Sequence, residues 1–269
     1  MTEDPFAELK KRQREMWSSF SPTAMFTTPV AGHVVSFADI KAGEAVLDVG
    51  TGTGVVAITA ARAGANVKAL DLTPELLEAA RENARIAGCE VEWTEGDAEQ
   101  LPYATGSFDV VLSQFGHMFA PRPEVVVAEM RRVLKPTGRV VFATWPPEHF
   151  TGRMFMLVGR HSPPPPPGAA PPPQWGSPVV IAERLASHFQ PPFFARGTMT
   201  FPALSLGHYR AFMERSVGPM QKLVEGLSNA PEKLAALRAE FDALVAPYYS
   251  GNLVHQDYIL TRAQARIAS

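Results

Sequence analysis

Short apolar runs alternate with amphipathic segments through the first half of the chain. Runs of roughly four to eight apolar residues between turn-forming residues predict buried strands, whereas apolar residues spaced three and four apart predict helices. The predicted strands cover residues 46–49, 66–70, 89–94, 106–113 and 139–144, and the helices between them begin at residues 55, 74 and 123. This alternation predicts a doubly wound parallel sheet with helices on both faces.

The ends of the chain carry more helix than such a sheet requires. Further helices are predicted at 5–17, 29–37, 177–189, 205–227 and 231–245, and further strands at 193–201 and 253–261. The two late helices fall between the last two strands, so we expect them to form a lid. Prolines crowd residues 163–173, and because proline cannot donate to a strand ladder, this stretch predicts a surface segment or linker.

Composition narrows the classes of partner. The chain has 269 residues, 46% of them apolar, and a formal net charge of −2, which gives no electrostatic reason to expect nucleic acid or an anionic membrane. One cysteine, Cys89, excludes an intramolecular disulfide and fits a reducing compartment. No apolar run reaches the length of a membrane span, and the first residues lack the pattern of a signal peptide. We therefore expect a cytoplasmic protein with a small-molecule partner and no membrane span.

Three glycines at alternate positions, Gly50, Gly52 and Gly54, join the first strand to the next helix. Glycine permits positive φ and close approach of a ligand, and the free N–H groups of the helix start face that ligand. Asp48 at the strand end offers a carboxylate to a ligand's ammonium or to the loop itself. A dinucleotide fingerprint would place its third glycine at Val55. The loop predicts a nucleotide-type cofactor, with an ordinary glycine-rich turn as the alternative.

This loop resembles motif I of the class I S-adenosylmethionine (SAM) dependent methyltransferases. The later helix, the Leu-Lys-Pro-x-Gly turn at residues 134–138 and the strand after it also follow that family, so the resemblance covers residues 44–145. It implies SAM as cofactor. We expect no metal, because the sequence shows no carboxylate cluster that matches a metal-dependent catechol type. The residues that the resemblance assigns to the methionine part are Asp48, Gly50, Thr51, Gly52 and Gly54.

Asp71 ends the second strand about twenty residues beyond the glycine loop, where nucleotide-binding α/β folds place a carboxylate for the ribose hydroxyls. A dehydrogenase and a methyltransferase would both use it. Leu72 follows directly and is a further cofactor candidate. The resemblance assigns Asp97 and Ala98 to the adenine, and an Asx turn is the alternative for Asp97.

Three more cofactor candidates lie outside these motifs. Gln114 ends the fourth strand, whose carboxyl end points at the same crevice. In related methyltransferases an N-terminal segment folds over the cofactor with an aromatic residue beside it, which makes Trp17 and Phe20 candidates. Ordinary packing of an N-terminal helix is the alternative.

The acceptor is expected where the fourth and fifth strands end beside the cofactor. The aromatic and methionine residues predicted to line its pocket are Phe115, Met118, Phe119, Trp145, Phe150, Met154 and Trp175. His117 and His149 follow the same two strands and are candidates for a catalytic base, with ordinary loop histidine as the alternative.

Taken with the resemblance, the sequence predicts a seven-stranded, Rossmann-like α/β sheet with the last strand antiparallel and a helical lid insertion. We expect one domain, with cofactor-covering helices at 1–43, a SAM-binding core at 44–145, a substrate insertion at 146–252 and a final strand and tail at 253–269. The implied activity is methyl transfer to O, N or C of a small, largely apolar or aromatic metabolite, as in ubiquinone/menaquinone-type (type 11) methyltransferases. The alternatives are a SAM-binding protein without catalysis and an NAD-dependent oxidoreductase. The oligomeric state stays open, and a homodimer is compatible.

Overall fold

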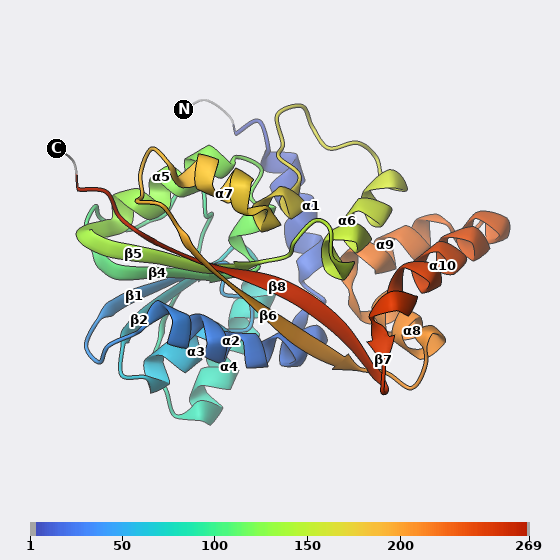
Figure 1. Ribbon diagram of the computed structural model, residues 1–269, viewed down its shortest axis with the longest axis horizontal. Helices are drawn as coiled ribbons and strands as arrows, with labels where there is room; N and C mark the ends of the chain where they lie inside the picture. The colour runs from blue at the N-terminus through green and yellow to red at the C-terminus, as the bar shows by residue number, and fades with distance from the viewer. Residues whose placement is uncertain (1–3, 268–269) are drawn as a thin grey trace.

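The computed structural model describes residues 4–267 and is built on one mixed sheet (Figure 1). Its strands are β1 (Ala45–Val49), β2 (Asn66–Asp71), β3 (Glu92–Glu95), β4 (Phe108–Gln114), β5 (Leu134–Thr144), β6 (Phe193–Pro202), β7 (Tyr249–Ser250) and β8 (Leu253–Gln264). Seven of them follow the order β3-β2-β1-β4-β5-β8-β6, and the two-residue β7, which the sequence did not predict, pairs with β8.

The first five strands are parallel, and β8 is antiparallel to both β5 and β6. The predicted doubly wound sheet with an antiparallel last strand is therefore confirmed. In-register pairing of Asp48 with Ala69 and with Leu112 brings the carboxyl ends of β1, β2 and β4 to one edge. Loops that follow these strands consequently meet at that edge, which is where open α/β sheets bind ligands.

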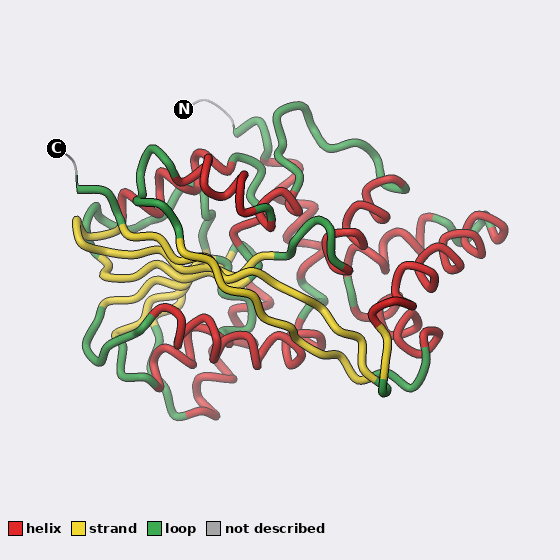
Figure 2. Tube along the Cα trace, in the orientation of Figure 1, coloured by secondary structure: helices red, strands yellow, loops and turns green. Residues whose placement is uncertain are grey.

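Helices cover both faces of the sheet (Figures 1 and 2). Their bounds are α1 (Ala7–Trp17), α2 (Ala24–Ala38), α3 (Val55–Arg62), α4 (Pro74–Ala87), α5 (Pro123–Val133), α6 (Phe150–Arg160), α7 (Pro178–Leu185), α8 (Leu206–Ser216), α9 (Gly218–Gly226) and α10 (Pro231–Val245). In Figure 1, α2, α3 and α4 lie on one face and α5 and α7 on the other, while α8, α9 and α10 gather at one end beyond the extended β6 and β8. No helix within residues 4–267 is long and apolar enough to cross a membrane.

Two apolar clusters are buried. The first lies between the sheet and its helices, and the second joins α6, the ends of β6 and β8, and the three late helices around Phe150, Tyr209 and Phe241. Phe26 of α2 and Phe155 of α6 pack against both clusters. Because truncating a buried aromatic costs about 3–5 kcal/mol, the late helices are held firmly to the rest of the chain.

The predicted single helix at 205–227 is wrong, because the chain bends at Val217 and separates α8 from α9. Pro219 in the first turn of α9 cannot donate a backbone hydrogen bond, so it starts a helix but does not continue one. Gly218 allows α1 to approach, since a Cβ there would lie 2.2 Å from the Met16 carbonyl oxygen. The break therefore seats α9 directly against the N-terminal helix.

Other predicted boundaries of helices and strands differ from the observed ones by smaller amounts. The third strand begins at Glu92 and not at residue 89, the fifth begins already at Leu134, and the helix expected at 29–37 starts at Ala24 with Pro29 inside it. Residues 163–171 of the proline tract lie outside helix and strand and are mostly exposed, as predicted, whereas Pro172 and Pro173 begin a short 3-10 helix in which Pro173 is buried.

Candidate cofactor and acceptor site

The three loop glycines have different structural roles. All have positive φ: +67° at Gly50, +56° at Gly52 and +83° at Gly54. A Cβ on Gly50 would lie 2.8 Å from Gly116 Cα, and one on Gly54 would lie 2.7 Å from the Trp93 ring. A Cβ on Gly52 would meet no atom of the described residues within 4 Å. Gly50 and Gly54 thus permit close packing, whereas the Gly52 backbone stays open on the cavity side.

Asp71 supports this loop from the end of β2. Its Oδ2 accepts a hydrogen bond from Gly52 N at 2.7 Å, and its Oδ1 accepts one from Thr73 N at 2.9 Å. Burial raises the pKa of the Asp71 carboxyl, and these hydrogen bonds oppose that rise. Each carboxylate oxygen can accept a second hydrogen bond, so Asp71 can hold the loop and a ligand hydroxyl together.

Asp48 lies under the loop with one oxygen unused. Its Oδ2 accepts from Thr51 Oγ1 at 2.6 Å and from Ala57 N in the first turn of α3 at 3.2 Å. Its Oδ1 is buried without a hydrogen-bond partner among residues 4–267. Burial raises the pKa of Asp48 from 3.8 to about 7, and the nearby Asp71 adds to the rise. A cation placed at Oδ1 would relieve this unfavourable burial.

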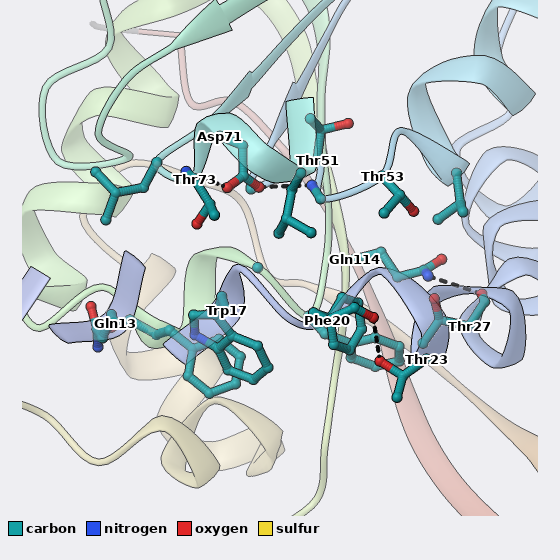
Figure 3. Close-up of a pocket in the computed structure, with 18 of the residues that line it drawn as sticks. Gln13, Trp17, Phe20, Thr23, Thr27, Thr51, Thr53, Asp71, Thr73 and Gln114 are labelled. Carbon is teal, nitrogen blue, oxygen red and sulfur yellow. Dashed lines mark hydrogen bonds between the residues drawn. The ribbon is translucent and has the colours of Figure 1, made fainter. Parts of the chain in front are cut away.

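A cavity of about 230 Å³ runs from the glycine loop toward the late helices. Figure 3 shows Thr51 and Asp71 on one side and Trp17 and Phe20 on the opposite side, so the N-terminal segment faces the glycine loop across the cavity. Gln114 lies between them, and its Nε2 donates to the Thr27 carbonyl at 3.0 Å. Gln114 Oε1 is buried and has no partner in the described part of the chain.

Helix α1 is fastened over the cavity by buried charges. Lys10 Nζ lies 2.6 Å from Asp4, 2.6 Å from Asp97 and 2.5 Å from Glu99, and Arg122 pairs with Glu99 at 2.7 Å. Burial opposes protonation of Lys10, but the three carboxylates outweigh it and raise its pKa. These are the carboxylates that come closest to metal-ligand spacing within residues 4–267, and the lysine ammonium already occupies their centre.

The far end of α1 contacts the acceptor side of the cavity. Gln13 Nε2 donates to the Phe119 carbonyl at 2.9 Å, and the Trp17 ring packs against the Phe119 ring with centroids 4.7 Å apart. Trp17 Nε1 is buried without a partner in the residues that the structure describes. The indole therefore keeps a free donor beside the cavity.

The end of the cavity near the late helices is apolar. Phe115 takes a positive φ of 61° directly after β4, and its ring stacks on Trp145 with centroids 3.8 Å apart and planes 10° apart. A bulky residue with positive φ is strained, so the stack holds a conformation that the backbone alone would avoid. Other apolar side chains lining this end are Phe119, Met154, Phe201 and Met213.

Most of the residues expected to contact a cofactor line this cavity. They are Trp17, Asp48, Gly50, Thr51, Gly52, Asp71, Leu72, Asp97, Ala98 and Gln114. Of the expected acceptor residues, Phe115, Phe119, Trp145 and Met154 line it as well. Gly54, Met118, Phe150 and Trp175 do not: Met118 and Trp175 pack in the sheet core, and Phe150 packs in the second cluster.

Both candidate histidines lie away from the cavity lining. The His117 ring is fully buried between Phe142 and Trp175, and burial lowers its pKa from 6.5 to about 3. His149 is partly exposed, with Nδ1 3.3 Å from an oxygen of Asp257. Neither ring is placed to take a proton from a molecule in the cavity.

Several lining residues were not identified from the sequence. Lys10, Gln13 and Thr27 reach the site through contacts between distant parts of the chain, which leave no local signal. Gln256, in contrast, did leave a local signal in the sequence. It lies on the same buried face of β8 as Val254 and Tyr258, and a polar residue on the buried face of a strand indicates a hydrogen-bonded or functional position.

The fold is that of the class I SAM-dependent methyltransferases, and the chain belongs to this family. The family model described as "Methyltransferase domain" matches residues 47–142. The chain is 34% identical over 255 residues to an uncharacterised protein of Mycobacterium tuberculosis, covering 93% of each. It is also 39% identical over 109 residues to the demethylmenaquinone methyltransferase of Thermus thermophilus, covering 40% of this chain and 50% of that one.

Solved structures agree on the fold. A putative methyltransferase from Bacillus halodurans superposes with a TM-score of 0.57 at 22% identity, covering 87% of this chain and 97% of that one. The YcgJ protein of Bacillus subtilis gives a TM-score of 0.59 at 19% identity, covering 88% and 98%. At this level of identity the likeness concerns the fold alone.

Proposed function

We propose that this protein binds SAM and transfers its methyl group to a small, neutral, largely aromatic acceptor. The observation that carries the proposal is the continuous cavity, which has carboxylates and a glycine loop at one end and stacked aromatic rings at the other. A SAM-binding protein without catalysis would need no apolar space beside the cofactor site. The single cysteine supports a reducing, cytoplasmic setting.

The residues present fit the cofactor. Asp48 Oδ1 is a buried acceptor without a partner in residues 4–267, which suits the ammonium of the methionine part. The open backbone at Gly52 suits its close approach, and Asp71 suits the ribose hydroxyls. Asp97 and Ala98 suit the adenine, although Asp97 Oδ2 is shared with Lys10.

The bound cofactor would supply a methyl group on a positively charged sulfur. What the protein must then provide is alignment of the acceptor's lone pair and exclusion of water, because the acceptor attacks in line as the carbon–sulfur bond breaks. The Phe115–Trp145 stack offers a flat apolar surface for that alignment. Because neither histidine lines the cavity, we assign no base, and any proton that the methylated acceptor releases passes to solvent once the products leave.

Thermal unfolding with added ligands tests the cofactor. A ligand that binds only the folded state raises the midpoint with the logarithm of its concentration over its dissociation constant. We expect SAM and S-adenosylhomocysteine to raise the midpoint and NAD to leave it unchanged. Asp71→Ala should abolish the rise, and Asp109→Ala, a strand carboxylate outside the cavity, should keep it. A rise with NAD alone would support an oxidoreductase instead.

A further inference from the structure

Three polar side chains form a chain of hydrogen bonds at the apolar end of the cavity. Thr151 Oγ1 donates to Gln256 Oε1 at 3.1 Å, and Gln256 Nε2 donates to the Tyr209 hydroxyl at 2.9 Å. All three residues line the cavity, and they come from α6, β8 and α8. Each is at most 6% exposed. Buried polar groups are costly unless their hydrogen bonds are satisfied, so each remaining donor or acceptor of the chain matters.

The direction of these hydrogen bonds leaves the proton of the Tyr209 hydroxyl without an acceptor. The Gln256 amide uses its oxygen for Thr151 and its nitrogen for Tyr209, so the Tyr209 oxygen already accepts. A phenol hydroxyl can also donate once, and Tyr209 donates to no group within residues 4–267. Burial raises the pKa of Tyr209 well above its ordinary value of 10, so the hydroxyl keeps its proton. Tyr209 is therefore a donor and not a base.

The surroundings of Tyr209 determine which ligand it can accept. Its ring packs against those of Phe150, Phe201 and Phe241, at centroid distances of 5.8, 5.0 and 6.1 Å. The charged side chains that line the cavity are Lys10, Arg14, Asp48, Asp71 and Asp97, which lie on α1, near the carboxyl ends of β1 and β2, and in the loop that follows β3. An ionised acceptor beside Tyr209 would consequently have no counter-ion among the side chains of the cavity. S-adenosylhomocysteine, which lacks the positive charge on sulfur, would supply none either, so burying such an ion in that complex costs several kcal/mol.

We infer that the acceptor is a neutral aromatic molecule carrying an oxygen that accepts a hydrogen bond, and that the Tyr209 hydroxyl donates to that oxygen. Gln256 and Thr151 act as positioning residues, because they hold the Tyr209 oxygen as an acceptor and so direct its proton to the ligand. This inference rests on the proposed function, since it concerns the acceptor end of the same cavity. It adds a specificity determinant, Tyr209, and a chemical class of substrate.

Binding of three matched small molecules tests this inference. Binding of 1-tetralone, of the parent hydrocarbon tetralin and of the anion 1-naphthoate would be measured by calorimetry on the protein saturated with S-adenosylhomocysteine. We expect 1-tetralone to bind about 3- to 10-fold more tightly than tetralin, the range of one net hydrogen bond, and 1-naphthoate to bind weakest. Tyr209→Phe keeps the ring and should bind the ketone and the hydrocarbon equally.

Tyr249→Phe is the matched control, because its hydroxyl bonds Ala203 and Asn252 and the residue does not line the cavity. It should keep the preference for the ketone. Gln256→Glu should lose that preference with Tyr209 intact, because a carboxylate would accept the tyrosine proton. Equal binding of ketone and hydrocarbon to the wild type, a preference that survives in Tyr209→Phe, or tightest binding of the anion would overturn the inference.

S-adenosylhomocysteine affinity separates this inference from the proposed function. Wild type and Tyr209→Phe should bind S-adenosylhomocysteine equally, since Tyr209 lies away from the glycine loop. Failure of the wild type to bind it would overturn the proposed function and this inference together. Normal binding of S-adenosylhomocysteine without a ketone preference would overturn the inference alone.

Discussion

Replacing Asp48 by asparagine should stabilise the free protein at alkaline pH and weaken cofactor binding. The carboxyl has a pKa of about 7 in the fold against an ordinary 3.8, so ionisation disfavours the folded state. At about 1.4 kcal/mol for each pH unit, the difference amounts to about 4 kcal/mol above pH 7. Asparagine removes this penalty but leaves an amide N–H unpaired where Oδ1 lay, which costs about 1–3 kcal/mol. The net gain at pH 8 is about 1–3 kcal/mol.

The sign of the effect should reverse with pH. A raised carboxyl pKa means that the folded state holds more protons between pH 3.8 and about 7, so the wild type gains stability as pH falls through that window. Between pH 8 and pH 5 the wild type should gain about 3 kcal/mol relative to Asp48→Asn. Urea unfolding of both proteins at the two pH values measures this difference directly.

Cofactor binding supplies the second readout for Asp48→Asn. Loss of a charged hydrogen bond to the ligand's ammonium should weaken S-adenosylhomocysteine about 10- to 100-fold at pH 8. Asp109→Asn is the control: Lys135 outweighs burial and lowers the Asp109 pKa, so this variant should lose stability at pH 8 and keep its affinity. If Asp48→Asn is less stable than wild type at pH 8, or binds S-adenosylhomocysteine normally, the role given to Asp48 is refuted.

Three further variants have distinct expected outcomes. Gly50→Ala should cost about 2–5 kcal/mol in urea unfolding, from positive φ and the clash with Gly116, whereas Gly52→Ala should cost only about 1–2 kcal/mol; equal losses would contradict the packing role of Gly50. Lys10→Met should cost about 3 kcal/mol and weaken binding of S-adenosylhomocysteine, because three carboxylates lose the lysine, Arg122 still pairs with Glu99 and Asp4 but not with Asp97, and α1 is held less firmly; an unchanged affinity would contradict a role of α1 in cofactor binding. His117→Phe should be more stable to acid than the wild type, because the lowered pKa of His117 makes the wild type lose about 2 kcal/mol of unfolding free energy between pH 6.5 and pH 5. Parallel curves of unfolding free energy against pH for the two proteins would contradict the burial of His117.

The sheet could be predicted from the sequence because its strands are short and apolar and the helices between them are amphipathic, so periodicity marks each element. The antiparallel last strand could not be derived this way, since pairing of β8 with β5 and β6 depends on distant residues, and it came from the family resemblance. The break at Val217 did leave a local signal in Gly218 and Pro219. The apolar periodicity continues on both sides of the break and concealed it.

Part of the candidate site could likewise be predicted from the sequence, and part could not. The glycine loop follows directly after β1 and Asp71 ends β2, and the topology brings these strand ends together at one edge. Position after a strand does not fix where a side chain points, which is why His117 turns into the core while Phe115, two residues earlier, lines the cavity. The Thr151–Gln256–Tyr209 chain joins three elements far apart in sequence, so only the folded structure brings it together.

A crystal structure of the complex with S-adenosylhomocysteine tests the central claim most directly. We expect the ligand's ammonium at Asp48 Oδ1, its ribose at Asp71, and its sulfur facing an open apolar space bounded by the Phe115–Trp145 stack and Tyr209. Such a space would accommodate an acceptor in line with a transferable methyl group. A complex in which side chains fill the space beside the sulfur would contradict the methyltransferase account and leave a SAM-binding protein without catalysis.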